Sequence, residues 1–320
     1  MKLRISLFVL ILLSLLMASC APAPAKPGTD EDVTLKMALL PIIDTLPMYV
    51  AQQEGLFAKH GVKVEFVPVA SAPDRDALIA SKQADGMINE TISTFLFNKD
   101  APQVEIVRYA LRPTAEAGHF FILASGQSGI TKPEQLKGVE IGVSQGTVIE
   151  YVTDRLLEAQ GFTPDEIKTV AVPKLPDRMS LLASGELKAA VLPDPYGGLA
   201  VQQGAVPVLD DSQYPQYGFS VISFRKEVLD GHRQMVKNFL AAIEEATQLV
   251  NENPGKYTSV LSDNKIVPQP LLGTYKVPPF PAAGVPTQAE WQDALKWAKD
   301  KGMISADVPY DTSVTSAYLP

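Results

Sequence analysis

Side chains that commonly act in catalysis or metal binding are few in this 320-residue chain, and they lie far apart in the sequence. The three histidines are His60, His119 and His232, and the only cysteine is Cys20. The motifs HExxH, CxxC and GxSxG are absent, and so are the phosphate-binding motifs GxGxxG and GxxxxGKS/T. The sequence therefore favours a protein that is not an enzyme and that holds neither a metal nor a cofactor.

The position of the only cysteine indicates a different chemistry, the attachment of a lipid. Two basic residues precede an apolar run over residues 5–17, which has the length of a signal-peptide core and is too short to span a bilayer. Met17-Ala18-Ser19-Cys20 follows this run and resembles a bacterial lipobox. We predict a lipoprotein signal peptide over 1–19, attachment of diacylglycerol and palmitate at Cys20, and a disordered tether over 20–33. An ordinary secretory signal with an incidental cysteine is the alternative.

The charge of the chain excludes some classes of partner. The formal net charge is −8, and removal of the signal peptide with Lys2 and Arg4 would change it to −10. No cluster of basic residues occurs, so we expect no nucleic acid partner and no attraction to anionic membrane surfaces. The lipid on Cys20 is then the only expected contact with a membrane.

The remaining chain has the pattern of alternating strands and helices. The first set has predicted strands at 33–40, 62–69, 86–88 and 104–111, with helices at 47–60, 73–82 and 92–98. The second set has predicted strands at 119–124, 139–143, 169–172, 189–192 and 206–209, with helices at 133–136, 148–160, 175–184 and 196–203. A strand at 219–224, a long helix at 231–253 and a helix at 288–301 complete the chain.

This alternation predicts an α/β protein of two lobes, each a mainly parallel sheet flanked by helices. We expect lobe I to comprise residues 34–115 and, after the chain returns, 216–320 with the C-terminal helices. Lobe II is expected at 116–215. Two crossing segments, near 112–118 and 211–219, would join the lobes.

The ligand site of such a fold is predicted by the ends of its strands. In open parallel sheets, ligands bind beyond the carboxyl ends of the strands, where helix N-termini offer free N–H groups. Both lobes contribute loops of this kind, so we expect a small molecule between the lobes and closure of the lobes only when it bridges them. The predicted binding residues are Asp44, Thr45, Tyr49, Ser71, Asn89, Glu90 and Thr91 in lobe I and Gln145, Gly146, Thr147, Asp194 and Tyr196 in lobe II.

Several of these residues have an alternative structural role. Five are well placed to cap the helix that follows them: Asp44, Ser71, Thr91, Thr147 and Asp194. Gly146 is also typical of a turn, and Tyr49 has the spacing of a core residue. A Pro-rich stretch at 274–281 is either a strap that brings Tyr275 or Phe280 to the cleft or a rigid surface connection.

The charges predicted at the cleft bear on the class of ligand. The loops carry neutral and acidic side chains, and Arg112 and Arg178 are the only arginines close to the predicted cleft or crossings. A nitrate or sulfonate ligand would ordinarily be held by cationic groups as well as by N–H donors. A neutral or amine-bearing heteroaromatic ligand, such as a pyrimidine, is therefore favoured, and an inorganic or sulfonate anion is the alternative.

Three segments, in order along the chain, carry a family resemblance. Residues 51–66 (AQQEGLFAKHGVKVEF) resemble the signature of the NMT1/THI5-like (NitT/TauT-type) solute-binding family, in which a helix and two glycines precede a strand. Residues 136–143 (LKGVEIGV) are similar to the element that opens the second lobe of type II periplasmic binding proteins. Residues 182–195 (LASGELKAAVLPDP) resemble a later element of the same proteins. The resemblance covers roughly residues 34–320.

This resemblance implies a type II periplasmic-binding-protein fold and a role as the binding lipoprotein of an ABC importer. The family includes binding proteins for nitrate, taurine, aliphatic sulfonates and thiamine-pyrimidine precursors. Such a protein is a monomer on the extracytoplasmic face of the cell membrane and delivers its small-molecule ligand to a permease and an ATPase on separate chains. Pyrimidine synthases of the THI5 type and menaquinone-pathway enzymes share the architecture, so an enzyme is the alternative. The Cys-rich motif that the synthases would bring is absent.

Overall fold

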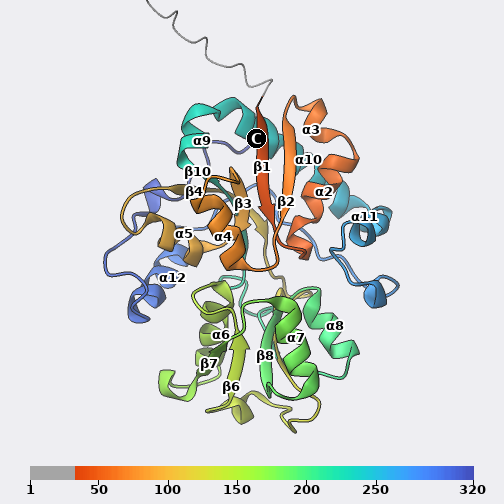
Figure 1. The fold of residues 1–320 in the computed structure, drawn as a ribbon, viewed down its shortest axis with the longest axis vertical. Coiled ribbons are helices and arrows are strands. Elements are labelled where there is room, and N and C mark those ends of the chain that lie inside the picture. Colours follow the sequence, from red (N-terminus) through yellow and green to blue (C-terminus); the bar gives the residue numbers. More distant parts are fainter. Residues whose placement is uncertain (1–32) are drawn as a thin grey trace, which may run out of the picture. The chain divides into compact units, whose positions relative to one another are not determined.

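A computed structural model describes residues 33–320; the predicted signal peptide, Cys20 and all but the last residue of the predicted tether lie outside the described residues. From Thr34 onward the chain forms one compact unit that contains two five-stranded sheets (Figure 1). Each sheet is covered by helices and forms the centre of one lobe.

The sheet of lobe I has the strand order β2-β1-β3-β10-β4. Its strands are β1 (Thr34–Leu39), β2 (Lys63–Pro68), β3 (Gly86–Asn89), β4 (Val104–Leu111) and β10 (Ser220–Arg225). β2 and β3 pair with β1 in parallel, and β10 pairs with both β3 and β4 in antiparallel. Four strands therefore run in one direction and only β10 opposes them.

The sheet of lobe II repeats this arrangement in the order β7-β6-β8-β5-β9. Its strands are β5 (Phe120–Ala124), β6 (Glu140–Val143), β7 (Lys168–Ala171), β8 (Ala189–Pro193) and β9 (Val206–Asp210). β5 is the one antiparallel strand here. In both lobes the antiparallel strand is the first strand in the sequence after the chain crosses over. It therefore enters its sheet from the side that faces the other lobe.

These sheets confirm the predicted two-lobed α/β fold with mainly parallel sheets and two crossing segments. The chain leaves the first sheet after Leu111 and returns to it at Ser220, and all strands of the second sheet lie between these residues. The boundaries between 115 and 116 and between 215 and 216 fall within the connecting segments and stay predictions.

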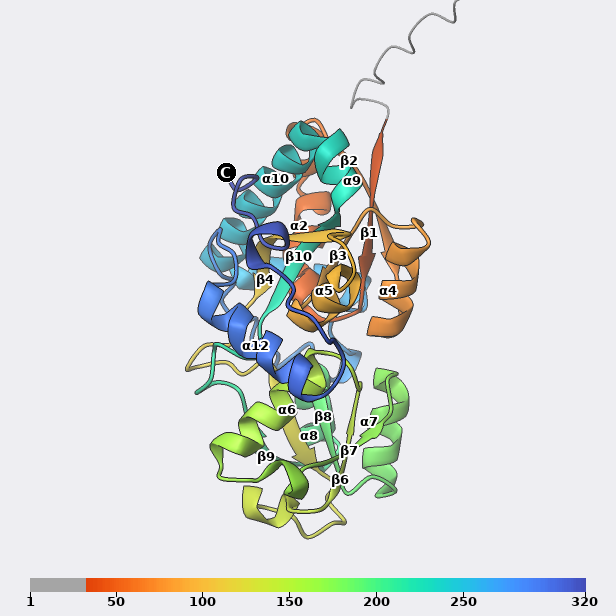
Figure 2. The same ribbon diagram turned by 90° about the vertical axis from the view of Figure 1, so that its left-hand side faces the viewer.

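The helices cover both faces of each sheet (Figures 1 and 2). The α-helices are α2 (Leu46–Gln53), α3 (Leu56–Lys59), α4 (Ala72–Ala80), α5 (Thr91–Asn98), α6 (Val148–Ala159), α7 (Leu175–Ser184), α8 (Tyr196–Gln202), α9 (Lys226–Gly231), α10 (Arg233–Glu252), α11 (Thr258–Asp263) and α12 (Gln288–Asp300). Short 3₁₀ turns lie at η2 (Ile43–Thr45), η3 (Pro133–Leu136), η4 (Pro164–Glu166), η5 (Pro254–Tyr257), η6 (Gln269–Leu271) and η7 (Tyr310–Thr312).

One predicted helix is interrupted in the structure. The helix predicted at 47–60 breaks into α2 and α3 at Gly55, whose φ of +69° is a left-handed conformation that glycine adopts at little cost. The long helix predicted at 231–253 is present as α10 with nearly its predicted bounds, and a separate short helix, α9, precedes it. Hydrophobic periodicity alone does not reveal the break at Gly55.

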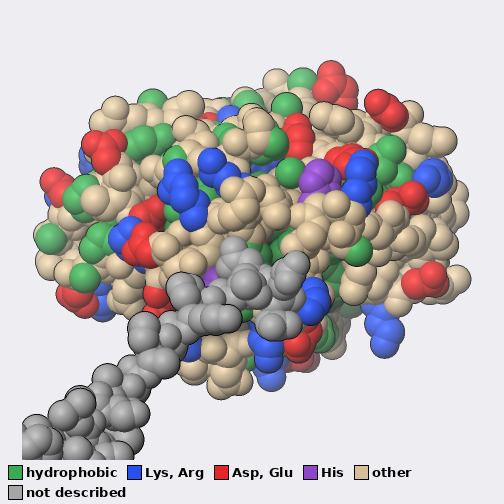
Figure 3. All heavy atoms as spheres, turned by 90° about the horizontal axis from the view of Figure 1, so that it is seen from above, with side chains coloured by type: hydrophobic (Ala, Val, Ile, Leu, Met, Phe, Trp, Pro, Cys, Tyr) green, Lys and Arg blue, Asp and Glu red, His purple; other side chains and the backbone are tan. Residues whose placement is uncertain are grey.

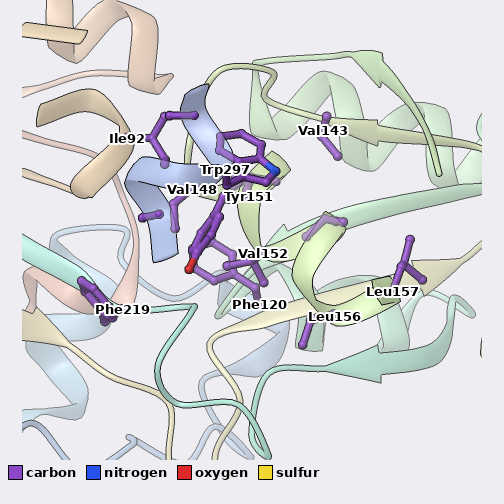
Figure 4. Packing of buried hydrophobic residues seen from close by; sticks show 14 of the residues in the cluster. Ile92, Phe120, Val143, Val148, Tyr151, Val152, Leu156, Leu157, Phe219 and Trp297 are labelled. Carbon is purple, nitrogen blue, oxygen red and sulfur yellow. The ribbon is translucent and has the colours of Figure 1, made fainter. Parts of the chain in front are cut away.

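Close packing between the strands and helices fixes the loops that follow each strand. In lobe I, a Cβ on Gly86 would lie 2.7 Å from the ring of Phe224 and 2.8 Å from the sulfur of Met37, so only glycine lets β1, β3 and β10 approach this closely. A large apolar cluster includes Ile92 of lobe I, Trp297 of α12 and Tyr151 of lobe II, and it therefore joins the lobes (Figure 4). Burial on this scale is the main source of stability for such a fold.

The surface agrees with the charge pattern of the sequence. Lysine and arginine side chains are interspersed with aspartate and glutamate over the face shown in Figure 3. Among the helices of residues 33–320, none combines the length and the apolar character that crossing a membrane requires.

Candidate functional site

A cavity of about 60 Å³ lies between the lobes, beyond the carboxyl ends of strands from both sheets. An engineered cavity of about 150 Å³ holds benzene, so a ligand of that size or larger requires the walls of this cleft to move apart. The lobe I wall consists of Leu40, Ile42, Asp44, Ala72, Arg75, Ile88, Asn89, Glu90 and Ser220. The lobe II wall consists of His119, Phe120, Ser144, Thr147, Val148, Ile149, Pro173, Leu175 and Pro193.

The lobe I wall contains a buried ion-pair network built around Arg75. This arginine lies on α4, and its Nε donates to Asp76 at 2.8 Å while Nη2 lies 3.4 Å from Glu90. Glu90 follows β3, and its other carboxylate oxygen caps α5 by accepting from the N–H of Ser93 at 3.0 Å. Burial raises the pKa of Glu90 to about 7, although the Arg75 guanidinium acts in the opposite direction. Glu90 therefore changes its protonation near neutral pH.

Asp44 and His119 join the two lobes at one edge of the cavity. The Nε2 of His119 lies 3.2 Å from the Asp44 carboxylate, and the Ser220 hydroxyl donates to the same carboxylate. The Nδ1 of His119 lies 2.6 Å from the carbonyl of Gly218 in the second crossing. Both ring nitrogens thus face acceptors, which only the doubly protonated imidazolium satisfies.

The pKa values of this pair follow from the geometry. Burial alone would lower the pKa of His119, but the charge and hydrogen bond of Asp44 outweigh it and raise the pKa to about 9. Burial likewise would raise the pKa of Asp44, but His119 and the Ser220 hydroxyl hold it below its usual value. Asp211, at the start of the second crossing, bonds to the backbone at the start of β5. One of its oxygens accepts from the N–H of His119 at 2.7 Å and from the N–H of Phe120 at 3.1 Å. Burial raises the pKa of Asp211 to about 6.

The lobe II wall is apolar apart from the start of α6. Thr147 caps this 12-residue helix by accepting from the N–H of Ile149 at 3.2 Å, and its own hydroxyl donates to the carbonyl of Ser144. The hydroxyl of Ser144 is buried and has no hydrogen-bond partner among the described residues. It is therefore available to a ligand group, and the positive end of α6 favours an acceptor there.

A second buried guanidinium, that of Arg178 on α7, lies directly behind the lobe II wall. It donates to the carbonyls of Val172, Pro173 and Val191, at 2.8, 3.2 and 2.6 Å, and no carboxylate among the described residues pairs with it. Burial lowers the pKa of Arg178 to about 9. Arg178 therefore fixes the ends of β7 and β8, whose following residues form the wall.

The comparison with known families decides the classification. A family model described as NMT1/THI5 like matches residues 42–257, which include every residue that lines the cavity except Leu40. The chain belongs to this family.

Relatives of this NMT1/THI5-like protein are known from sequence and from structure. A protein of Brachyspira hyodysenteriae, named as an ABC transporter periplasmic binding protein, is 26% identical over 267 residues, which cover 78% of this chain and 74% of the relative. The ligand-binding component of an ABC-type import system from Staphylococcus aureus, solved with zinc bound, has a TM-score of 0.74 at 14% identity and covers 89% of this chain and 97% of its own. An alkanesulfonate-binding protein from Xanthomonas axonopodis pv. citri, bound to MOPS, has a TM-score of 0.73 at 16% identity, with 92% and 99% covered.

The same fold also occurs in an enzyme. A desulfurization enzyme has a TM-score of 0.66 at 16% identity and covers 89% of this chain and 97% of its own. At such identities the structural likeness establishes the fold alone. Within residues 33–320 there is no group of three or more side chains placed to hold a metal ion.

Four of the predicted binding residues of this NMT1/THI5-like protein line the cavity: Asp44, Asn89, Glu90 and Thr147. Asn89 is already engaged in lobe I, since its amide donates to Thr94 at 3.1 Å and its carbonyl accepts from Ser223 at 2.6 Å. Glu90 and Asp44 thus present the acidic groups of the lobe I wall.

Five predicted residues lie close behind the walls and make local contacts. Thr45 donates to the carbonyl of Ile42, Ser71 caps α4, and Thr91 is the buried first residue of α5. In lobe II, the exposed Gln145 amide contacts Thr169, and the N–H of Gly146 donates to Glu150 at 2.8 Å. None of the five lines the cavity, so their assignment as binding residues stays a prediction for another state of the cleft.

Three predicted residues point elsewhere. Tyr49 packs edge-on against the ring of Phe66, at 4.9 Å between centroids, and both rings are partly buried. Tyr196 packs against the apolar cluster of lobe II. Asp194 lines a separate hollow near the crossings and accepts from the hydroxyl of Tyr275.

The capping alternative is correct for two of the five residues that it concerned. The hydroxyls of Ser71 and Thr147 cap α4 and α6. It is wrong for Asp44, Thr91 and Asp194, because the residues at the N-cap positions of α2, α5 and α8 are Thr45, Glu90 and Pro195. In each case the helix starts one residue later or earlier than local pattern indicates.

Four polar residues that line the cavity are not among the predicted ones: Arg75, His119, Ser144 and Ser220. Arg75 corrects the expectation that Arg112 and Arg178 are the arginines nearest the cleft, since Arg112 pairs with Glu290 and Arg178 is behind the wall. A signal for Arg75 exists in the sequence. Pro-Asp-Arg occurs at 73–75 and again at 176–178, and in both copies the arginine donates to a strand carbonyl 13 residues later.

Proposed function

We propose that the protein is the extracytoplasmic solute-binding component of an ABC importer, which captures a small organic molecule between its lobes and delivers it to a permease. The observation that carries this proposal is the cavity in which residues of both lobes meet, in a chain of a binding-protein family. Ligand pockets are commonly apolar with a few placed polar groups, and this cleft has that composition. The relative from Brachyspira hyodysenteriae, by its name, supports the same role.

The charges of the cleft support a neutral or amine-bearing heterocycle, such as a thiamine-precursor pyrimidine, as the ligand. Arg75 is the cationic side chain that an anion would use, but Asp76 and Glu90 already pair with it. A nitrate or sulfonate would have to compete with these two carboxylates. A ring that donates to Glu90 and accepts from Ser144 would instead use the polar groups of both walls, and the apolar residues around them would cover its faces.

The arrangement of serine, histidine and aspartate in the cavity argues against hydrolytic chemistry. In a nucleophilic triad the histidine accepts the proton of the serine hydroxyl and the aspartate orients the histidine. Here Ser220 and His119 both bond to the carboxylate of Asp44, which lies between them. Because both nitrogens of His119 face acceptors, the ring has no lone pair free to act as a base. The groups are therefore suited to hold the lobes and not to activate a nucleophile.

The remaining parts of the proposal concern location and partners. The sequence of residues 1–20 supports export and a lipid anchor at Cys20, which would keep the protein at the outer face of the cytoplasmic membrane. The permease and the ATPase would be separate chains, and the binding protein would act as a monomer. Labelling with palmitate and membrane fractionation test the anchor independently of the ligand.

A thermal-shift screen of the purified chain tests the ligand. The panel should contain thiamine-pathway pyrimidines, riboflavin, amino acids, taurine, alkanesulfonates and nitrate. A ligand at 100 times its dissociation constant raises the free energy of unfolding by about 2.7 kcal/mol. We expect a pyrimidine or a similar heterocycle to produce the largest shift, and Glu90→Gln to reduce it. A selective shift with nitrate or a sulfonate would contradict the charge argument, and turnover of any panel compound would contradict the binding role.

A further inference from the structure

We infer that the C-terminal segment 269–301, from η6 through α12, is a clasp that holds the two lobes closed in the absence of ligand. The sequence predicts that the lobes close only when a ligand bridges them. The structure adds contacts between the lobes that belong to the chain itself and lie on either side of the cavity. The inference goes beyond the proposed function, because it concerns the resting state of the binding protein and applies whatever the ligand is.

The first end of α12 is fixed to lobe I. Glu290 accepts from Arg112 at 2.6 Å and from the hydroxyl of Tyr109 at 2.7 Å. Trp291, the next residue, is fully buried and packs edge-on against Phe95 of α5, with 4.5 Å between ring centroids. This combination of a buried ion pair and a buried indole makes α12 a part of lobe I.

The second half of α12 contacts lobe II at α6. Asp293 accepts from the hydroxyl of Tyr151 at 2.6 Å and from Nε of Arg155 at 2.8 Å. One turn further, the indole N–H of Trp297 donates to the buried Asp154 at 2.7 Å. Figure 2 shows α12 lying between α5 above and α6 below, while α4 and α7 lie on the opposite side. A rigid helix of 13 residues thus spans from one lobe to the other.

The stretch between η6 and α12 makes a second bridge, at α8. The hydroxyl of Tyr275 donates to Asp194, which directly follows β8, and the amide of Gln202 donates to the carbonyl of Pro270 at 3.2 Å. Phe280 returns to lobe I, where it is buried and its N–H and carbonyl both bond to Asn251 of α10. Neither Tyr275 nor Phe280 lines the cavity, so the structure does not bear out a strap that brings them to the cleft; Tyr275 bonds to lobe II outside the cavity.

Opening of the cleft must break these contacts, because lobe II cannot leave lobe I while α6 and α8 stay bonded to the clasp. The contacts on the lobe II side involve charged groups, which form the stronger hydrogen bonds in proteins. The side chain of Asp293 is 40% exposed, so its bonds can re-form when the cleft closes without the cost of fully burying its charge. Loss of one charge-assisted bond changes such an equilibrium by about tenfold. Removing one such bond from each bridge should therefore open a measurable fraction of the molecules, while Trp297 and Lys301 keep their contacts with Asp154 of α6.

The distance between the lobes tests this without any ligand. Cys20→Ser leaves the full chain without cysteine, so one spin label can be placed in each lobe, at Ala77→Cys on α4 and Ser180→Cys on α7. Both positions are exposed and lie opposite α12. Pulsed electron spin resonance then gives the distribution of distances in the ligand-free protein. Circular dichroism confirms that each variant is folded.

We expect one short distance in the unmodified background and a longer one in Asp293→Ala/Tyr275→Phe, with the open-to-closed ratio raised at least tenfold. Asp300→Ala and Tyr318→Phe are matched controls, since Asp300 pairs with Lys296 of its own helix and Tyr318 bonds to Leu229 and Arg233 within lobe I, outside the clasp. Tyr275→Phe alone, which removes a single hydroxyl, keeps the test decisive if the double variant does not fold. A long distance in the unmodified background, or equal distributions in clasp and control variants, would overturn the inference. Either result leaves the proposed importer function standing, because that function depends on binding and not on the resting state.

Discussion

The ion pair between His119 and Asp44 makes a quantitative prediction about stability and pH. The pKa of His119 is raised from 6.5 to about 9 in the folded protein, because Asp44 stabilises the charged ring. A pKa raised above the unfolded value means that the folded state binds the proton more tightly. The stabilisation is therefore complete below pH 6.5 and is lost as the pH rises through 9.

The size of the effect follows from the difference between the two pKa values. About 2.5 pKa units correspond to about 3 kcal/mol of stabilisation at low pH. About 2 kcal/mol of this remains at pH 7.5 and almost none at pH 9.5, from the proton-binding equilibria of the two states. We therefore expect the free energy of unfolding to fall by about 2 kcal/mol over this range through His119 alone.

Urea unfolding of the chain and of His119→Gln isolates this contribution. Glutamine keeps a donor towards Asp44 but cannot ionise, so the difference between the two proteins should decrease by about 2 kcal/mol between pH 7.5 and 9.5. Groups that titrate in both proteins, such as Arg178 with its pKa of about 9, cancel in this difference. His60→Gln is the matched control, because His60 lies at the end of α3 and contacts only Glu245, 3.0 Å away.

A double variant makes the test sharper. Asp44→Asn combined with His119→Gln removes the carboxylate that the single variant leaves buried and unpaired. It should lack the His119 contribution to the pH dependence just as the single variant does, with a smaller loss of stability than the single variant. A difference between the parent protein and His119→Gln that stays constant from pH 7.5 to 9.5 would refute the assignment of the charge to His119.

Three further predictions concern the anchor, the cleft and the lobe II wall. Cys20→Ser should abolish labelling by palmitate and release the protein from membranes; equal labelling of both forms would exclude a lipid at this residue. Glu90→Gln should remove the pH dependence of ligand affinity between pH 6 and 8, because the pKa of Glu90 is raised to about 7 by burial. Calorimetry with the best ligand of the screen measures this affinity, and an unchanged pH profile would show that another group causes the pH dependence. Arg178→Met should lower the free energy of unfolding by about 3 kcal/mol, since three buried carbonyls lose their donor; urea unfolding at pH 7 would show no loss if water replaces the guanidinium.

The fold was largely predictable because its signals are local. The bounds of β4 and α7 agree with the predicted 104–111 and 175–184, where apolar periodicity and the flanking prolines coincide. The break at Gly55 depends on a single backbone conformation, which periodicity does not record. The position of the cleft follows from topology alone, and for that reason Asp44, Asn89, Glu90 and Thr147 were predictable.

The residues that could not be predicted are those whose role depends on a partner far along the chain. His119 looks isolated in the sequence, and its significance comes from Asp44, which is 75 residues earlier. Asp194 has the pattern of a helix cap, but its carboxylate bonds to Tyr275, 81 residues later. The helix α12 was predictable as a helix. Nothing in its own periodicity indicates that its first turn contacts lobe I while its second half contacts lobe II.

The repeated Pro-Asp-Arg motif explains why a motif alone does not give the electrostatics of a site. Arg75 and Arg178 occupy equivalent places, and each donates to the carbonyl of the next parallel strand. The residues at equivalent positions around them differ: Asp76 and Glu90 in lobe I correspond to Met179 and Pro193 in lobe II, one and 15 residues after each arginine. The first guanidinium is therefore neutralised by carboxylates and has its pKa raised, while the second is surrounded by carbonyls and has its pKa lowered by burial. One repeated motif thus lies behind an acidic wall in lobe I and a largely apolar wall in lobe II, and the contrast is set by the different residues one and 15 positions after each arginine.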